Sequence, residues 1–131
     1  MNTGRIIVES FGFLFGMDEA DMVMDVRGLQ NPFYVPQLRE LTGLDAPVRD
    51  YIFSFPESVA YFEAMMELLR QRCKLLEHQH TQMRHALKIA IGCSGGQHRS
   101  VAFAEAVGQE LRKLGYDVAV EHRELHKRTE L

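Results

Sequence analysis

Short apolar runs, separated by polar or glycine-rich breaks, divide the chain into predicted strands and helices. They predict β-strands at residues 5–9, 22–26, 87–91 and 116–120. Their apolar residues are largely continuous rather than alternating, which is typical of a parallel sheet covered on both faces. Between the second and third strands, residues 27–47 contain several glycines and prolines and are predicted to form an irregular loop.

Two stretches carry apolar residues at the helical spacing of three and four. The longer one predicts a helix over 57–84, with Ser54 and Glu57 in the pattern of a capping box at its start. Its apolar stripe should cover a sheet face and bury Cys73, although the same stripe would also suit a dimer seam. The second stretch predicts a helix over 98–114.

The order of the last predicted elements decides the fold class. A strand, a glycine-rich loop, a helix and a strand follow one another between residues 87 and 120. That order is a βαβ unit, in which a helix connects two parallel strands. We therefore expect an α/β fold with a small open, mostly parallel sheet and helices packed on its faces. The sequence shows no linker or repeat, so residues 1–131 are expected to form a single domain with a basic tail at about 122–131.

The composition is that of an ordinary globular chain. The 131 residues suit one domain, and 46% hydrophobic with 25% charged residues excludes disordered and fibrous classes. Nothing in the sequence approaches the roughly 20 apolar residues of a membrane span. The two cysteines, in unlike contexts, are typical of reduced thiols. We therefore expect a cytoplasmic protein that does not associate with membranes.

The net charge of −3 is unevenly distributed. Residues 1–83 carry 7 basic and 12 acidic side chains, whereas residues 84–131 carry 8 basic and 6 acidic ones. This asymmetry permits an anionic ligand near the C-terminal third, while the overall acidity argues against indiscriminate nucleic-acid binding. The histidines offer no third ligand at a metal-binding spacing, so we expect no metal, and no other cofactor is implied.

The segment Gly92-Cys93-Ser94-Gly95-Gly96-Gln97-His98-Arg99-Ser100 joins a predicted strand to a predicted helix. Its adjacent glycines allow a tight turn, and a helix start adds unpaired N–H groups and a partial positive charge. Arg99 adds a cation whose planar fork suits phosphate. The segment thus predicts an anion-binding loop, and the alternative is a tight turn with a solvated arginine. It lacks the Lys-Ser/Thr pair of a Walker A loop, which argues against a P-loop ATPase or GTPase.

Cys93 and Arg99 are separated by five residues, and Ser100 follows. This spacing resembles the phosphate loop of the cysteine-dependent phosphatases, in which a thiolate attacks phosphorus. A phosphatase also needs a general acid, for which Asp25 and Asp45 are candidates, but nothing in the sequence places either over the loop. A small phosphatase using Cys93 and Arg99 is therefore the alternative function, while the first hypothesis is a non-catalytic binding module.

Several segments together resemble one known domain. The most specific is IGCSGGQHRSV at 91–101. The others are VESFGF at 8–13, DVR at 25–27, NP at 31–32, LRELTGLDAPV at 38–48 and HREL at 122–125. On these segments, which follow the same order, the chain resembles the C-terminal domain of the RapZ family of bacterial RNase adapter proteins over nearly its whole length.

The resemblance implies an α/β fold related to part of phosphofructokinase. It also implies a domain that binds a small regulatory RNA, presents it to a ribonuclease and senses glucosamine-6-phosphate. Full-length family members assemble as oligomers and usually carry an N-terminal P-loop domain, so this chain is expected to be a stand-alone version. The expected partners are a phosphate or phosphosugar ligand, a regulatory RNA, a ribonuclease and further copies of the chain.

Carried over residue by residue, the resemblance also implies site residues. The sugar-phosphate pocket would consist of Cys93, Ser94, Gly95, Gly96, Gln97, His98, Arg99 and Ser100, with Asp25, Arg27 and Asn31 nearby. The RNA surface would consist of Arg123, Lys127 and Arg128, and Arg99 could belong to both surfaces. From the residues alone, Asp25 and Arg27 could equally be salt-bridge partners. After Asn31-Pro32 the family commonly has His-Trp where this chain has Phe33-Tyr34, which removes a polar sugar contact.

Overall fold

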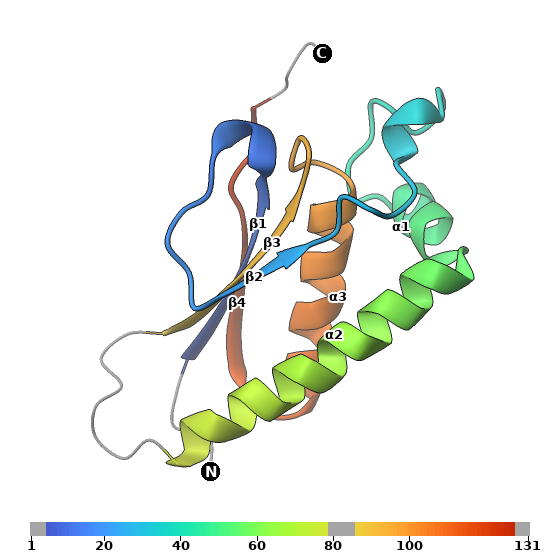
Figure 1. Cartoon of the computed structure of the whole chain (residues 1–131). Coiled ribbons are helices and arrows are strands. Elements are labelled where there is room, and N and C mark those ends of the chain that lie inside the picture. The colour runs from blue at the N-terminus through green and yellow to red at the C-terminus, as the bar shows by residue number, and fades with distance from the viewer. Residues whose placement is uncertain (1–4, 79–85, 128–131) are drawn as a thin grey trace.

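A four-stranded parallel sheet forms the centre of the domain (Figure 1). The computed structural model describes residues 5–78 and 86–127. Its strands are β1 (Arg5–Gly12), β2 (Met22–Asp25), β3 (Leu87–Cys93) and β4 (Asp117–His122), in the spatial order β2-β3-β1-β4. Every pair of neighbouring strands is parallel. The α/β prediction is confirmed, and the sheet of the described residues is wholly parallel.

Three α-helices form a layer on one side of this sheet (Figure 1). They are α1 (Ala46–Phe53), α2 (Pro56–Lys74) and α3 (Arg99–Lys113), with 3-10 turns η1 (Phe13–Phe15), η2 (Pro32–Tyr34) and η3 (Leu75–His78) between the elements. The central helix α3 packs on β1, β3 and β4, and both α1 and α2 contact α3. None of the helices in the described part of the chain has the length and apolar character needed to cross a bilayer.

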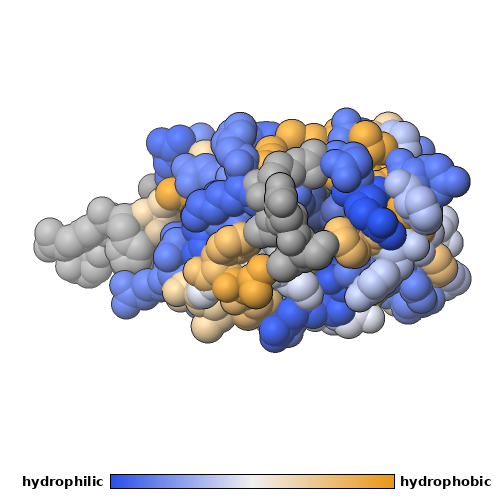
Figure 2. Space-filling view, turned by 90° about the horizontal axis from the view of Figure 1, so that it is seen from above, coloured by the Kyte–Doolittle hydropathy of each residue, from blue (hydrophilic) through white to orange (hydrophobic). Residues whose placement is uncertain are grey.

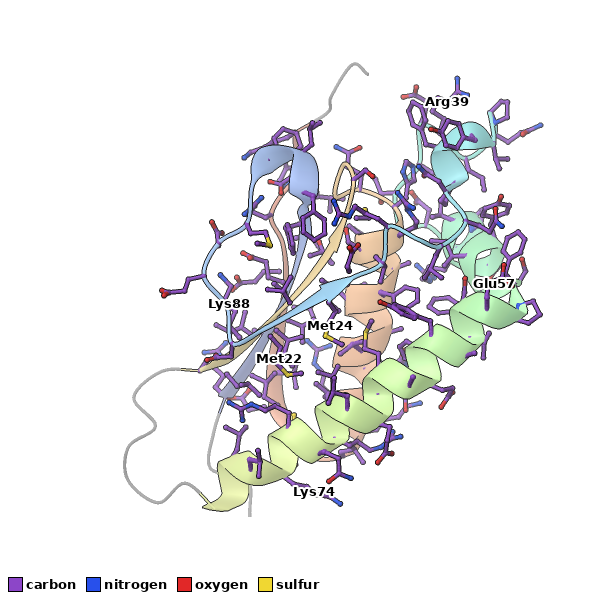
Figure 3. The ribbon with its side chains drawn as sticks, in the orientation of Figure 1. Met22, Met24, Arg39, Glu57, Lys74 and Lys88 are labelled. Atoms are coloured by element: carbon purple, nitrogen blue, oxygen red, sulfur yellow. The ribbon has the colours of Figure 1, made fainter. Side chains whose placement is uncertain are left out.

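Alternate strand side chains divide the sheet into a helix face and a second face. Val8 on β1 and Ile89 on β3 are fully buried in the core with the helices. Their neighbours in sequence, Glu9 and Lys88, point to the second face. There they form an ion pair, with Lys88 Nζ 3.3 Å from Glu9 Oε1. Figure 3 shows Met24 on the side of β2 that faces α2, with Lys88 on the opposite side.

The second face is covered differently from the prediction. Instead of a helix, the segment that follows β1 lies over it (Figure 1). Phe11 and Phe13 stack edge to face with ring centroids 4.7 Å apart, and both rings occupy the space where a side chain on Gly92 would project. Large aromatic side chains can therefore bury the carboxyl-terminal half of this face without a second helical layer.

The segment between β2 and α2 is more regular than the predicted loop. The helix α1 begins after Asp45 with Pro47 in its first turn, where the missing N–H of proline has no helical partner to lose. The capping-box prediction is wrong, because α2 begins after Phe55 with no side-chain cap. Ser54 instead ends α1, and its Oγ donates to the carbonyl oxygen of Tyr51 at 2.7 Å.

The predicted apolar stripe of α2 and the predicted end of α3 are confirmed within the described residues. Met66, Leu69 and Cys73 are buried on the side of α2 that faces the core. The helical stretch continues into η3, and residues 79–84 of the predicted helix lie outside the described residues. Gly115 has a φ of 98° just after α3, the left-handed conformation that favours glycine at a helix end.

Candidate functional site

The carboxyl ends of the parallel strands meet at one edge of the sheet, at the top of Figure 1. β1 ends at Gly12, β2 at Asp25 and β3 at Cys93, and the register aligns Gly12 with Cys93. Open α/β sheets bind ligands outside the carboxyl ends of their strands. At this edge, the glycine-rich loop 94–98 therefore lies next to the end of β2. From the sequence, this proximity was predicted only by the family resemblance.

Two glycine positions allow the loop to pass directly against the end of β1. A Cβ atom on Gly12 would lie 2.6 Å from the carbonyl carbon of Gly95, and a Cβ atom on Gly96 would lie 2.6 Å from the backbone nitrogen of Gly12. Gly96 also has a φ of 78°. By contrast, apart from its two chain neighbours, no described residue comes within 4 Å of a Cβ on Gly95, and Ser94 is exposed. The open side of the loop is therefore Ser94 and Gly95.

Arg99 lies beneath this open side, and its buried side chain connects two loops. Its side chain is only 4% exposed, and its Nη1 donates to the carbonyl oxygens of Arg27 at 2.6 Å and Leu29 at 3.0 Å. Its Nη2 lies 3.4 Å from Ser94 Oγ, and its buried Nε has no hydrogen-bond partner among the described residues. The alternative of a solvated arginine is therefore wrong, because this guanidinium connects the loop after β3 with the loop after β2.

Asp25 and Arg27 form an ion pair at the same edge. Arg27 Nη2 lies 2.8 Å from Asp25 Oδ2, and Asp25 Oδ1 accepts from both Nε and the backbone N–H of Arg27. The hydrogen bond from the Arg27 side chain lowers the pKa of Asp25, and the charge of Arg99 acts in the same direction. Arg27 also lies over the ring of Phe13, with Cζ 3.7 Å from its centroid. The half-exposed pair is thus held in place by charge and by the aromatic ring.

Cys93 is a core residue rather than an accessible thiol. Its side chain is 2% exposed, and its Sγ donates to Ser100 Oγ at 3.2 Å. An attacking thiolate must reach the phosphorus atom of its substrate, and this burial does not favour such a role. Neither candidate general acid is arranged for proton transfer. Asp25 is paired with Arg27. Asp45 lies at the start of α1, where its Oδ2 accepts from the backbone N–H of Thr42 at 2.8 Å.

Three further predicted site residues hold loops in place. Gln97 Nε2 donates to the carbonyl oxygen of Lys127 at 2.8 Å, which attaches the loop to the C-terminal segment. Asn31 Oδ1 accepts from the backbone N–H of Phe33 at 3.0 Å and begins η2. His98 is buried immediately before α3, with a backbone oxygen that accepts the first helical hydrogen bond. Gln97 and His98 are thus fixed within the loop, whereas Asn31 caps the start of η2.

The predicted RNA residues differ in exposure. Arg123 is largely buried, with Nη2 2.7 Å from Glu124 Oε2 and Nη1 3.1 Å from Asp18 Oδ2. Lys127 is exposed, and its Nζ lies 3.5 Å from Glu124 Oε1 and 5.4 Å from the ring centroid of Phe15. Arg128 lies outside the described residues. The structure thus commits Arg123 to internal ion pairs and leaves Lys127 at the surface.

An apolar patch lies next to Lys127. Leu14, Phe15 and Met17 are 58%, 37% and 58% exposed. Figure 2, which views the molecule from above, shows hydrophobic residues gathered on this side among strongly hydrophilic ones. This surface was not predicted from the sequence, because Leu14, Phe15 and Met17 follow the first strand without a helical or alternating pattern.

Within residues 5–78 and 86–127, no group of three or more His, Cys, Asp or Glu side chains is arranged to hold a metal ion. The site presents guanidinium groups, hydroxyls, backbone amides and the carboxylate of Asp25. These groups can bind and orient an anion.

Comparison with known proteins assigns the chain to a family. A family model described as the RapZ C-terminal domain matches residues 4–126. A nucleotide-binding protein of Lactiplantibacillus plantarum is 43% identical over 98% of this chain and 42% of its own length. Nucleotide-binding proteins of Bifidobacterium longum and Bacillus cytotoxicus are 46% and 45% identical, over 96% and 95% of this chain and 38% and 41% of their own lengths. The chain therefore spans about two fifths of the length of these curated relatives.

Proposed function

The chain belongs to the RapZ C-terminal domain family, and from that premise we propose that it is a non-catalytic binding module. In this proposal, the loop at residues 92–100 holds the phosphate group of a phosphosugar. Cys73 and Cys93 are both free thiols, which supports a location in the reducing cytoplasm.

One observation carries this proposal: Arg99 is buried beneath the open side of the loop, and its Nε has no acceptor among the described residues. A buried N–H without an acceptor costs roughly 1–3 kcal/mol, so the fold keeps Arg99 at this position at a cost to its stability. A phosphate oxygen above Ser94 and Gly95 would accept from Arg99, from the Ser94 hydroxyl and from the loop amides Gly95 to His98. Charge-assisted hydrogen bonds of this kind are the strong ones in proteins.

The charges around the loop favour an amino-sugar phosphate. Arg99 and Arg27 supply positive charge for a phosphate group, while Asp25 supplies a carboxylate at the same edge of the sheet. Because Asp25 is ionised at neutral pH, it can accept from the ammonium group of a sugar such as glucosamine-6-phosphate. The exposed aromatic Tyr34 replaces the tryptophan that is common in the family, so the sugar contacts on that side differ.

The amine preference is testable with two sugars that differ in one group. We expect the wild-type chain to bind glucosamine-6-phosphate about 5-fold more tightly than glucose-6-phosphate, the size of a partly exposed ion pair. Asp25→Asn should bring this ratio to about one, because it removes the carboxylate that meets the ammonium group. Isothermal titration calorimetry measures both affinities.

Asp50→Asn is the matched control, because Asp50 is an exposed carboxylate on α1 and this change should leave the ratio unaltered. Equal affinities for the two sugars in the wild-type chain would contradict the amino-sugar assignment while leaving phosphate binding intact. Binding of neither sugar would contradict the proposed function as a whole.

A regulatory RNA is the second ligand that we propose, because a cation and aromatic side chains lie together beside the loop. Unpaired bases stack on aromatic rings, and lysine contacts the phosphate backbone. Phe15 with Lys127 provides this combination at an exposed edge. Few cations are available in one copy of this acidic chain, so we propose that RNA binding, and with it delivery to a ribonuclease, occurs in a homo-oligomer, where several copies engage one RNA.

The salt dependence of RNA binding follows from the number of phosphate contacts. With Arg123 held in internal ion pairs, we expect a slope of about −1 to −2 in log K against log salt for each chain engaged. Lys127→Ala combined with Arg128→Ala should abolish binding at low salt. Phosphosugar affinity should change by less than about 2-fold, because the backbone oxygen of Lys127 that accepts from Gln97 remains. Fluorescence anisotropy across the oligomer–monomer transition measures RNA binding, and tight binding by a monomer, or by the double variant, would place the RNA surface elsewhere.

A further inference from the structure

The C-terminal segment 123–127 is anchored at the end of β1 by a buried carboxylate. Glu124 is fully buried, and its Oε2 accepts from the backbone N–H of Gly12 at 2.8 Å and from Arg123 Nε at 2.8 Å. Lys127 Nζ lies 3.5 Å from the other carboxylate oxygen. Gly12 is the last residue of β1, where the neighbouring strand no longer supplies an acceptor to this N–H group. Glu124 thus supplies that acceptor.

The same residue supports the glycine-rich loop from one side. Gln97 Nε2 donates to the backbone oxygen of Glu124 at 3.3 Å and to that of Lys127 at 2.8 Å. A Cβ atom on Gly96 would lie 2.9 Å from Glu124 Cβ, which shows that loop and anchor are in direct contact. The loop is therefore enclosed between the end of β1 and the segment that Glu124 fixes.

The charge of Glu124 is maintained despite its burial. Burial alone would raise the pKa of this carboxyl, but the hydrogen bonds from Arg123 and from the backbone of Gly12 outweigh it and lower the pKa. A carboxylate that is charged, buried and fully surrounded by donors holds its neighbours in one geometry, because any displacement leaves those donors unsatisfied.

We propose that Glu124 is the positioning residue of the anion loop: it fixes the C-terminal segment against the end of β1 and thereby holds Gly95 to Gln97 in the geometry that binds an anion. This inference rests on the proposed function, because it concerns the same loop. It also gives Arg123 a role other than the RNA binding that the resemblance implied. Arg123 is the internal counter-ion of Glu124.

The test uses the sign of an effect. If Glu124 acted on the anion only through its charge, its removal would tighten binding, since a carboxylate repels an anion. If Glu124 positions the loop, Glu124→Ala weakens binding of the probe, inorganic sulfate, by about 10-fold in spite of the lost negative charge. Backbone amide exchange at Gly12 and at Gly95 to Gln97 also becomes faster in this variant.

Glu124→Gln serves as the conservative variant, because its amide oxygen can still accept from Gly12 and its volume is the same. We expect it to regain most of the sulfate affinity, at about 3-fold below the wild-type chain, and it carries the test alone if Glu124→Ala fails to fold. Glu121→Gln removes one exposed charge from β4, close in sequence to Glu124, and should change sulfate affinity by less than about 2-fold.

Sulfate affinity that rises or stays constant in both Glu124 variants would overturn the proposal, as would unchanged exchange at Gly95 to Gln97. The exchange measurement needs no ligand, so it tests the positioning role even if the wild-type chain binds no sulfate. A wild-type chain that binds no sulfate would contradict the proposed anion site, but faster exchange in Glu124→Ala would still support the positioning role of Glu124. The two proposals can therefore fail separately.

Discussion

Arg99→Ala is expected to weaken the affinity for inorganic phosphate or sulfate by about 10–100-fold, the loss of a charge-assisted hydrogen bond of roughly 1.5–3 kcal/mol. The buried guanidinium is the cation beneath the open side of the loop, and it also bridges to the carbonyl oxygens of Arg27 and Leu29. The variant should therefore lose folding stability as well as affinity. Titration calorimetry at a temperature where the variant is fully folded separates the two effects.

Arg99→Lys and Arg70→Ala are the controls for this result. Lysine keeps the charge, but its compact ammonium group lacks the planar fork with which the guanidinium reaches the two carbonyl oxygens and the ligand, so we expect an intermediate affinity. Arg70 pairs with Glu67 on the surface of α2, and its removal takes away one positive charge without touching the loop. Affinity that is unchanged in Arg99→Ala, or lowered equally in Arg70→Ala, would show that the anion binds elsewhere or through net charge alone.

Gly96→Ala is expected to destabilise the fold by about 3 kcal/mol or more, because it combines a left-handed backbone with a steric clash. Gly96 has a φ of 78°, and a Cβ atom there would lie 2.6 Å from the nitrogen of Gly12, which belongs to a central strand and cannot move aside. Chemical denaturation with a two-state fit measures the change in the free energy of unfolding.

Gly95→Ala is the matched control next in sequence. Apart from its two chain neighbours, no described residue would lie within 4 Å of a Cβ atom on Gly95, so the free energy of unfolding should change by less than about 0.5 kcal/mol. The added methyl group would, however, project from the open side of the loop, and we expect it to weaken anion binding. Equal loss of stability in both variants would contradict the difference between the closed and open sides of the loop.

The elements that sequence periodicity predicted are those in which local pattern and tertiary packing agree. An apolar run, a glycine pair and a helical stripe predicted a strand at 87–91 and a helix at 98–114. The structure has them as Leu87–Cys93 and Arg99–Lys113. The helix α1 was missed because it is only eight residues long and because Pro47 was counted as a breaker although it occupies a first turn.

The candidate site could be predicted only in part. The glycine-rich loop was identified from its own residues, whereas Asp25 and Arg27 were placed beside it only by resemblance, since their position depends on the strand order β2-β3-β1-β4. In the sequence, Arg123 and Glu124 are two neighbouring polar residues in a basic tail. Glu124 is buried where its carboxylate accepts from Gly12 at the end of β1, and such a long-range contact leaves no local pattern in the sequence.

The central claim is that a phosphate-bearing ligand binds on the open side of the loop above Arg99. Titration of the isotope-labelled chain with glucosamine-6-phosphate, followed by two-dimensional NMR, tests it most directly, because each N–H group reports separately. We predict saturable shifts centred on the amides of Ser94 and Gly95 and on the Arg99 Nε–H group, which gains an acceptor. A spectrum without saturable shifts, or with shifts confined to residues away from this loop and Arg99, would contradict the account.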